Sequence, residues 1–287
     1  MMLNFQFDRQ VTLNLLGPLI KIFSKRNIRR IPILMYHSIS NNLKNSVHPY
    51  YQTSTSPDIF RKHMRFLYES KYSVINIQDF SKSLVNQDRE LYKAVILTFD
   101  DGFKDFYKQA FPILERYGFS ASVFLPTAYI GRKPIKFLKK ECLTWDQVRL
   151  LRKKGIIFGS HTVNHFKLYD MKMDDIQFEL GNSKNKIEHE IEEEIDSFSY
   201  PFAFPEQDHQ FTTKLKTLLL SNGYKRCFST IIGTENDQEK FYLKRIPVNN
   251  YDDLKMFKAK LEGFYDWVHS VQYVFKTIKS VKSRHIR

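Results

Sequence analysis

The chain has 287 residues, of which 42% are hydrophobic and 15% aromatic, which is enough for a large folded domain with a buried core. Its two cysteines, Cys142 and Cys227, are far apart and outside any C-x-x-C pattern, which argues against a disulfide framework and a cysteine-based zinc site. The formal net charge is +14, of which residues 1–30 contribute +5 and residues 251–287 contribute +4.

The excess positive charge at the two ends suggests contact with phosphate, because a cationic surface attracts lipid headgroups, lipid-linked sugars or nucleic acid. Nucleic acid is not expected, since the basic residues lack an interleaved aromatic recognition motif. Simple solubility is the competing explanation of the charge. A peripheral contact with an anionic membrane is therefore one hypothesis for these ends.

An apolar stretch near the N-terminus, residues 11–23, is too short to cross a bilayer and is interrupted by Asn14, Gly17, Pro18 and Lys21. No small-residue cleavage site follows it, as a signal peptide requires. We therefore expect a cytoplasmic protein, held peripherally at the inner face of the membrane if the basic ends bind there.

Strands and helices are expected to alternate along most of the chain. Ser56 followed by Pro57 is a typical helix start, Thr144 is a candidate cap, and Gly118 and Gly155 are helix ends. Such alternation favours an α/β architecture with a largely parallel sheet, in which a site gathers at the carboxyl ends of the strands. Strands are predicted at 30–39, 94–99, 121–125, 156–158, 198–200, 227–230 and 243–248, and helices at 56–70, 105–117, 143–154, 174–194 and 212–222.

The C-terminal segment carries a stripe of apolar residues at spacings of four and three, which predicts one amphipathic helix. The lysines and arginines beyond its middle have no acidic neighbour. The helix is expected to pack on its own domain, to lie on a membrane surface or to form a dimer contact. The stripe is Phe257, Leu261, Phe264, Val268, Val271, Phe275 and Ile278, and the basic residues are Lys276, Lys279, Lys282, Arg284 and Arg287.

Adjacent carboxylates, Asp100 and Asp101, end the predicted strand at 94–99. Neighbouring side chains at a strand end point in different directions, so one can face a metal while the other faces substrate or water. Asp-Asp-Gly also occurs in simple turns, and this alternative stays open.

A second polar cluster, His161 and His165, follows the predicted strand at 156–158. On one helical turn this spacing places both imidazoles on the same face, as two ligands of one metal. Imidazole and carboxylate together suit zinc, iron, nickel or cobalt. A third cluster, at 200–205, is a stiff aromatic loop without chemistry of its own.

Three segments resemble, in their order, the successive motifs of the polysaccharide deacetylases, which form carbohydrate esterase family four with NodB homology. They are TFDDG at 98–102, SHTVNH at 160–165 and SYPF at 199–202. LMYHSI at 34–39 and LTWDQ at 143–147 resemble segments of the branch that includes poly-N-acetylglucosamine deacetylases. The resemblance extends over most of the chain, from about Ile33 to about Val248.

The resemblance implies an α/β fold, a deformed (β/α) barrel with fewer than eight full units. It implies metal-dependent removal of acetyl groups from N-acetylated sugars, with one divalent ion, most often zinc. Asp101, His161 and His165 match the metal ligands, and Asp100 matches the general base. The loop of Tyr200, Pro201 and Phe202 matches a substrate-binding segment, in which the N–H of Phe202 helps stabilise an oxyanion.

Two family features are missing. Many members carry an arginine that orients the base just before the Pro-aromatic pair, where this chain has residues 198–200 without one. Arg245, after a later strand, is the candidate substitute, with a surface arginine as the alternative.

A late Leu-x-His motif that supplies the general acid is also absent. His37, at the end of the first strand, is the remaining candidate, with a buried structural histidine as the alternative. Trp145 is expected either to line the acetyl pocket or to pack in the core. Ala203 stands where the branch often has glycine.

These features predict a basic N-terminal segment at 1–30, a deacetylase domain at 31–250 and a basic amphipathic helix at 251–287. The expected substrate is an N-acetylated polysaccharide or a lipid-linked glycan. A carbohydrate-binding or regulatory relative with little turnover is the alternative. A two-carboxylate glycosidase is not expected, because the adjacent Asp100 and Asp101 would not flank a sugar bond at the required separation. The oligomeric state is left open.

Overall fold

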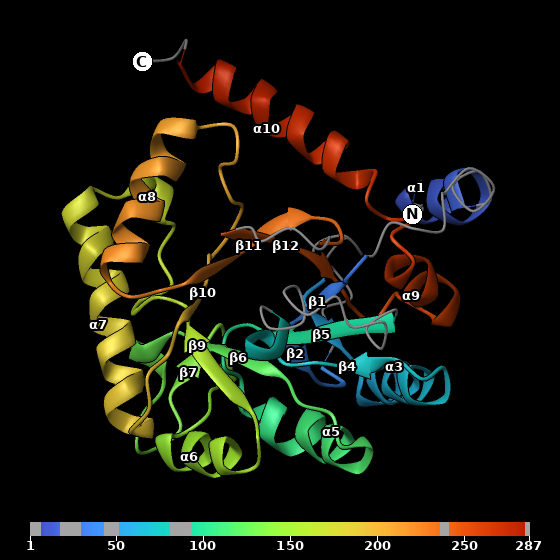
Figure 1. Ribbon diagram of the computed structural model, residues 1–287, viewed down its shortest axis with the longest axis horizontal. Helices are drawn as coiled ribbons and strands as arrows, with labels where there is room; N and C mark the ends of the chain where they lie inside the picture. The colour runs from blue at the N-terminus through green and yellow to red at the C-terminus, as the bar shows by residue number, and fades with distance from the viewer. Residues whose placement is uncertain (1–6, 18–29, 43–51, 81–92, 236–240, 285–287) are drawn as a thin grey trace.

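The computed structural model describes residues 7–17, 30–42, 52–80, 93–235 and 241–284, with side chains up to Thr277. Within these residues, seven parallel strands form a closed barrel surrounded by helices (Figure 1). The pairing of β1 with β5 closes the ring. This confirms the predicted deformed barrel with fewer than eight units. In neighbouring order the strands are β1 (Ile33–Tyr36), β12 (Tyr242–Pro247), β11 (Arg226–Ile232), β10 (Ser197–Ser199), β9 (Ile157–Ser160), β6 (Ser122–Leu125) and β5 (Ala94–Phe99).

The alternation of side chains along β5 decides what faces the barrel interior. Val95, Leu97 and Phe99 pack in the large core between barrel and helices. Ile96 points the other way, into a smaller core whose members, such as Phe228, come from several barrel strands. Continuing this alternation places Thr98 and Asp100 on the inner side, above that smaller core.

Helices that follow the barrel strands cover the outside of the barrel (Figure 1). Their starts follow local chemistry: Ser56 Oγ accepts the N–H of Ile59, and Thr144 and Gln147 form a reciprocal capping box. The segment predicted as one helix at 105–117 begins with a π-helical stretch, η4 (Phe106–Ala110). The covering helices are α3 (Pro57–Glu69), α5 (Phe111–Tyr117), α6 (Trp145–Lys153), α7 (Met173–Ile191) and α8 (His209–Ser221).

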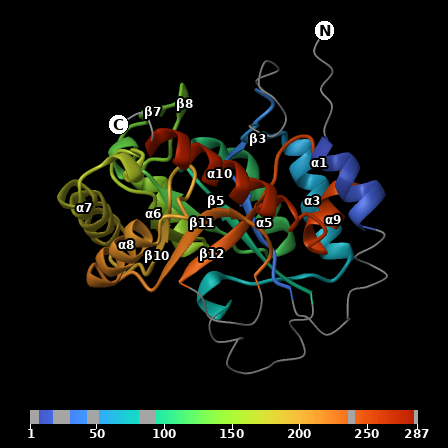
Figure 2. The same ribbon diagram turned by 90° about the horizontal axis from the view of Figure 1, so that it is seen from above.

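Several short elements were not predicted, because segments of two or three residues carry no periodic signal. Four of them, the pair β2–β3 and the hairpin β7–β8, belong to the connections after β1 and β6 and lie on one side of the barrel (Figure 2). The short elements are β2 (Ser38–Ile39), β3 (Ser54–Thr55), β4 (Ser73–Val74), β7 (Lys136–Phe137), β8 (Lys140–Glu141), η5 (Thr127–Tyr129) and η6 (Leu168–Asp170).

The predicted single C-terminal helix is wrong, because the stripe is divided between α9 (Leu254–Leu261) and α10 (Val268–Arg284). The chain turns between them, and Gly263 there has a φ of +75°, which favours glycine. The turn also meets the N-terminal α1 (Phe7–Gln10) and η1 (Val11–Leu16), where Trp267 Nε1 donates to Thr12 Oγ1 at 3.0 Å. Ile278 and the basic side chains after it lie outside the described side chains.

The two ends of the predicted stripe have opposite surroundings. Phe257 and Leu261 are buried under α9, whereas Val271 and Phe275 on α10 are 40% and 63% exposed. None of the described helices combines the length and apolar character that a membrane-spanning segment needs.

Candidate metal centre and active site

The carboxyl ends of four barrel strands bring together the polar residues that the sequence singled out. Asp100 and Asp101 follow β5, His161 follows β9, and His37 follows β1. Arg245 lies on β12, two residues after Leu243, and its side chain therefore shares the interior side with Leu243. Residues up to 208 positions apart in sequence thus surround one point at the mouth of the barrel.

Asp101, His161 and His165 form a cluster whose ligand atoms lie within 4.8 Å of one another. Asp101 Oδ1 lies 3.6 Å from His161 Nε2 and 3.4 Å from His165 Nε2. Ligand atoms bound at about 2.1 Å to a tetrahedral ion lie roughly 3.4 Å apart, so the spacing fits one small divalent ion. A carboxylate and two imidazoles suit zinc, and also iron, nickel or cobalt.

The protonation state of the two histidines also fits metal binding. His161 Nδ1 lies 2.7 Å from the carbonyl oxygen of Ser199, so Nδ1 carries the proton that it donates and the Nε2 lone pair faces Asp101. Burial lowers the pKa of His161 to about 3 and also lowers the pKa of His165. Both imidazoles are therefore neutral at neutral pH, as metal ligands must be.

Without a bound cation, the ionised form of Asp101 is disfavoured at this buried position. Burial, and then the neighbouring charge of Asp100, raise the pKa of Asp101 to about 8. A cation bound between Asp101 and the imidazoles would offset both effects. The three donors therefore fit a divalent metal in composition, spacing and charge.

The predicted helical turn from His161 to His165 is wrong, because these residues form a loop in which Thr162 and His165 have φ values of +70° and +56°. Within the loop, His165 N donates to Thr162 Oγ1 at 2.8 Å. The loop, and not a helix, brings the second imidazole back to Asp101.

A residue that the sequence analysis missed, Glu179 on α7, holds this loop. Its carboxylate accepts the N–H groups of Val163 and Asn164 at 2.8 and 2.9 Å and the side-chain amide of Asn164 at 2.6 Å. Glu179 is 1% exposed. One sequence signal could have revealed Glu179: it lies one helical turn after Ile176, on the side of α7 that also carries the buried Leu180, where a carboxylate needs a partner.

Asp100 is held on both oxygens by the guanidinium of Arg245, each at 2.8 Å. Arg245 also donates to the carbonyl oxygen of Ser229 at 3.0 Å, and Ser199 Oγ donates to Asp100 at 3.2 Å. Burial alone would raise the pKa of Asp100, but the charge and hydrogen bonds of Arg245 hold it well below its usual range. Asp100 is therefore an ionised carboxylate beside the metal ligands, and Arg245 is buried rather than a surface arginine.

His37 faces the same centre from β1 and is half-buried. Burial lowers its pKa to about 4, and the charges of Asp100, Arg245 and His165 also act on it. Among the described residues, none forms a hydrogen bond with its imidazole. His37 is thus placed beside the centre but is not fixed there as Asp100 is.

Of the residues expected to bind substrate, only Phe202 is exposed. Its ring is 51% exposed and packs against His165 at 4.9 Å between centroids. Its backbone has a φ of +60° and its N–H has no partner among the described residues. Tyr200 and Pro201 are buried beneath it and support the loop.

Trp145 is not brought to this group. Its side chain is 2% exposed in the large core, with the ammonium of Lys186 5.6 Å from the ring centroid. No interaction of Trp145 with the metal ligands is found in the described part of the chain. The structure favours the core-packing alternative.

The sequence of the chain is similar to known deacetylases. A family model described as polysaccharide deacetylase matches residues 88–225. YxkH of Bacillus subtilis, named as a polysaccharide deacetylase, is 28% identical over 235 residues, which are 82% of this chain and 77% of that protein. The poly-beta-1,6-N-acetyl-D-glucosamine N-deacetylase of Escherichia coli K12 is 31% identical over 121 residues, which are 39% of this chain and 18% of that protein.

Solved structures share the fold. The deacetylase PplD of Streptococcus pyogenes aligns with a TM-score of 0.69 at 23% identity, covering 82% of this chain and 99% of that one. IcaB from Ammonifex degensii aligns with a TM-score of 0.68 at 17% identity, covering 81% of this chain and 97% of that one.

Proposed function

Because this chain belongs to the polysaccharide deacetylase family, we propose that it is a metal-dependent hydrolase that removes acetyl groups from N-acetylated sugars. The observation that carries the proposal is the cluster of Asp101, His161 and His165 directly beside Asp100, whose two oxygens are bound by Arg245. This arrangement combines three neutral or anionic metal donors with a separate ionised carboxylate. Such a pair of functions is what hydrolysis of an unreactive amide requires.

Asp101, His161 and His165 would hold the ion. A divalent metal at this place supplies a Lewis acid for the acetyl carbonyl and lowers the pKa of a water molecule, so that hydroxide is available near neutral pH. Zinc is the first expectation for these donors, with nickel, cobalt and iron as alternatives.

The protein groups around the ligands divide the proton transfers. Asp100 accepts a proton from the attacking water. Arg245 keeps the carboxylate of Asp100 ionised and turned toward the centre. The N–H of Phe202 donates to the oxygen on which negative charge develops. Burial lowers the pKa of His37 to about 4, so its imidazole is neutral at neutral pH and passes to the departing amine the proton that Asp100 has accepted from water, in place of the late histidine that this sequence lacks.

The proposal is tested by acetate release from N-acetylglucosamine oligomers, with purified wild-type protein and the Asp100→Asn and His161→Ala variants. Wild-type protein is expected to release acetate with a bound divalent metal, and both variants are expected to lose this activity. Absence of acetate release with zinc, nickel, cobalt or iron would overturn the proposal. Sugar binding under the same conditions would then indicate the alternative, a carbohydrate-binding relative.

We also propose that α10 lies against an anionic membrane at the cytoplasmic face. Its inward side is polar: His269 contacts Glu206 at 2.8 Å, Lys276 pairs with Glu206 at 3.2 Å, and Gln272 donates to Thr230. Its apolar residues Val274 and Phe275 are instead 55% and 63% exposed. An amphipathic helix usually buries such a face.

The charge of this segment favours a lipid surface over a second copy of the chain. Residues 267–287 contain no acidic residue and five lysines or arginines, so two such segments repel each other. Anionic lipids attract the same charges and accept the apolar face. Glu206 belongs to the loop that carries Phe202, so docking of α10 would place the site near membrane-bound glycans.

Vesicle co-sedimentation tests this location. Wild-type protein is expected to bind vesicles of phosphatidylglycerol but not vesicles of neutral phosphatidylcholine. The double variant Val274→Asp with Phe275→Asp is expected to lose vesicle binding and to keep its rate of acetate release. Equal binding of wild-type protein and the double variant to phosphatidylglycerol vesicles would contradict the proposed membrane contact of α10.

A further inference from the structure

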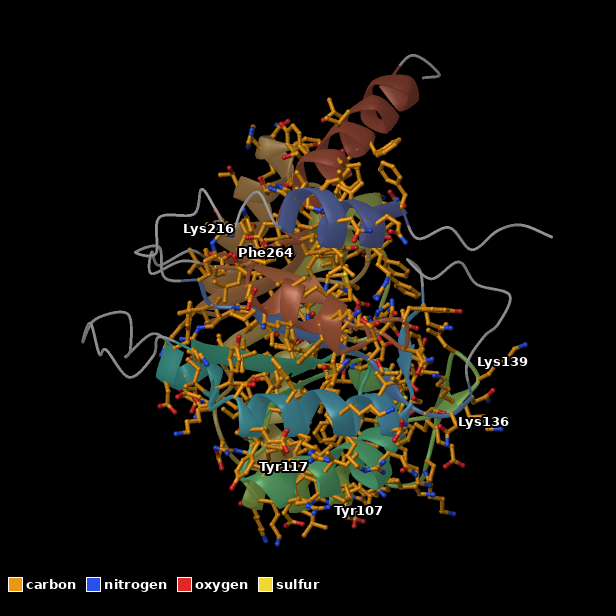
Figure 3. All side chains as sticks on the ribbon, turned by 90° about the vertical axis from the view of Figure 1, so that its right-hand side faces the viewer. Tyr107, Tyr117, Lys136, Lys139, Lys216 and Phe264 are labelled. Carbon is orange, nitrogen blue, oxygen red and sulfur yellow. The ribbon has the colours of Figure 1, made fainter. Side chains whose placement is uncertain are left out.

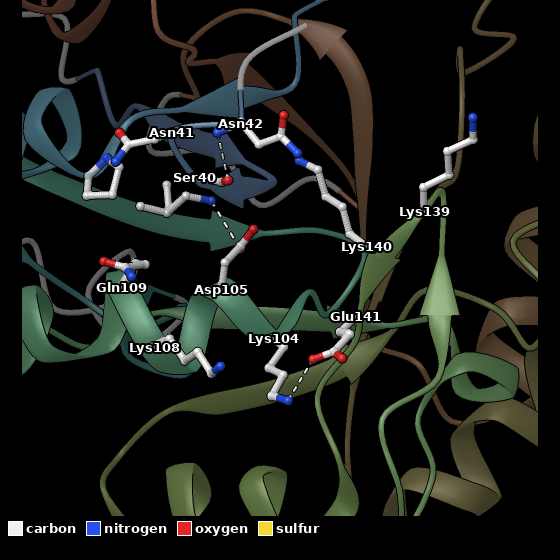
Figure 4. A pocket seen from close by; sticks show the side chains of 12 residues that line it. Ser40, Asn41, Asn42, Lys104, Asp105, Lys108, Gln109, Lys139, Lys140 and Glu141 are labelled. Carbon is white, nitrogen blue, oxygen red and sulfur yellow. Dashed lines mark hydrogen bonds and ion pairs between the residues drawn. The ribbon is translucent and has the colours of Figure 1, made fainter.

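A hollow of about 340 Å³ lies beside the metal centre and has the size of a small-ligand site. Figure 4 shows its walls: Lys104 and Lys108 lie on one side, Asn41 and Asn42 on another, and the β7–β8 hairpin closes a third. None of its twelve lining residues is a metal ligand or the proposed base. They are Ile39, Ser40, Asn41, Asn42, Pro57, Lys104, Asp105, Lys108, Gln109, Lys139, Lys140 and Glu141.

This hollow, the lysine pocket, shares three chain segments with the centre. Ser40 lies three residues after His37, and Asp105 lies four residues after Asp101. The β7–β8 hairpin provides Lys140 to the pocket, while its Phe137 packs on His165 with centroids 5.0 Å apart. A glycan that places one sugar at the centre therefore has its neighbouring sugar within reach of the pocket.

The two carboxylates of the pocket are already matched by other groups. Asp105 accepts Ser38 Oγ at 2.5 Å and the N–H of Ile39 at 3.1 Å. Glu141 pairs with Lys104 at 2.7 Å. Glu141 is thus offset by Lys104, whereas Asp105 keeps its negative charge because both of its hydrogen-bond donors are neutral.

The lysines exceed these carboxylates by two. Lys140 donates to Ser38 and Ser54 at 2.6 and 2.9 Å, which fixes its ammonium at the boundary between pocket and centre. Lys108 and Lys139 are exposed and have no ion pair in the described part of the chain. Figure 3 shows Lys139 projecting from the hairpin at the edge of the molecule, so it forms the outer rim.

We infer that the lysine pocket binds an anionic group, a phosphate or a carboxylate, carried by the glycan on the sugar next to the one that is deacetylated. The inference rests on the proposed function and names its substrate class. Lysine ammonium groups bind such anions as point charges. The amides of Asn41, Asn42 and Gln109 add hydrogen-bond groups for the hydroxyls of the same sugar.

Binding can be measured without turnover. Titration calorimetry compares glucose 6-phosphate, glucuronic acid and glucose, none of which carries an acetyl group, on wild-type protein. The variant combines Lys108→Ala with Lys139→Ala, and a matched control combines Lys153→Ala with Lys214→Ala, two exposed lysines that do not line the pocket. Each pocket lysine is expected to contribute roughly two- to five-fold to the affinity for an anionic sugar.

The expected result is binding of one or both anionic sugars to wild-type and control protein, about tenfold weaker binding to the pocket variant, and no difference for glucose. The phosphate and carboxylate arms identify which anion is preferred. Equal affinity of wild-type and pocket variant for both anionic sugars, or no binding of either, would overturn the inference.

Turnover separates this inference from the proposed function. With N-acetylglucosamine oligomers that are neutral or phosphorylated on the adjacent sugar, wild-type protein is expected to show a higher kcat/KM for the phosphorylated substrate. The pocket variant is expected to lose this preference and to keep its rate on the neutral oligomer. Anion binding without acetate release would contradict the deacetylase proposal alone, and equal rates on both oligomers would contradict the pocket alone.

Discussion

The two sides of the metal centre differ in how firmly they are held. On the base side, Asp100 and Arg245 are both nearly fully buried and joined through two hydrogen bonds of 2.8 Å. The proposed acid, His37, follows β1 between the strands of these two residues, is half-buried, and its imidazole has no hydrogen bond with a described residue. The proposed base is therefore positioned before substrate arrives, whereas the proposed acid is positioned by packing alone.

This difference follows from the barrel. Arg245 lies on β12 and Asp100 directly follows β5, the two strands that flank β1, and both side chains point into the interior, where the pair is shielded from water. His37 lies just beyond the end of β1, where the chain leaves the barrel toward β2. A proton acceptor for a small water molecule benefits from rigidity, while a donor to a bulky sugar amine needs space.

The largest effect is expected for Asp100→Asn, which keeps the shape of the side chain and removes its ability to accept a proton. The rate of acetate release is expected to fall by about 10²–10⁴-fold, the usual contribution of general base catalysis. Metal content should be unchanged, because Asp101 and not Asp100 is the proposed ligand. Loss of the metal together with activity would show that the two carboxylates have other roles.

Arg245→Met sharpens the comparison by leaving the buried Asp100 without its partner. Removal of one member of a buried ion pair typically costs about 3–5 kcal/mol, so the variant should unfold at markedly lower denaturant concentration. The double variant Arg245→Met with Asp100→Leu should recover part of this stability. If the single variant is as stable as wild type in urea unfolding, the base side is not held as described.

His37→Gln is expected to lower the rate by roughly 10²-fold, the lower end for general acid catalysis, because water can also reach this side. Stability should change little, since His37 makes no hydrogen bond with a described residue. With a substrate whose leaving group needs no proton, the kcat of the His37→Gln variant should return to the wild-type value. A variant with unchanged kcat on N-acetylglucosamine oligomers would remove His37 from the mechanism.

Glu179→Gln has the smallest expected effect, since Glu179 acts only through the loop of His165. Its side-chain amide would present a donor to backbone N–H groups that now meet a carboxylate oxygen. Metal binding should weaken by about 10–100-fold, as is usual for groups that support ligands. Excess metal should restore activity, and failure to do so would assign Glu179 another role.

The sequence predicted the long elements and the clusters well, because both leave local signals. The apolar run at 94–99 coincides with β5, and the structure brings together Asp101, His161 and His165, the three ligands that the family resemblance implies. The role of Arg245 as partner of Asp100 was one of two alternatives. Only the shared interior face of β5 and β12, which depends on barrel closure, distinguishes the two.

Other features depend on contacts that the sequence does not show. Glu179 looks like any helix carboxylate until its loop is folded against it. The apolar stripe suggested one C-terminal helix, but a turn around Gly263 rotates its second half toward solvent. Trp145 lies in a family motif, yet the core buries it.

The central claim is that one divalent ion at Asp101, His161 and His165 is required for deacetylation. Elemental analysis of purified protein, paired with acetate release before and after chelation, tests it most directly. We expect one ion per wild-type chain, loss of activity on chelation, recovery on addition of metal, and neither ion nor activity in His161→Ala. Sustained acetate release by metal-free protein, or a full complement of metal in His161→Ala, would contradict it.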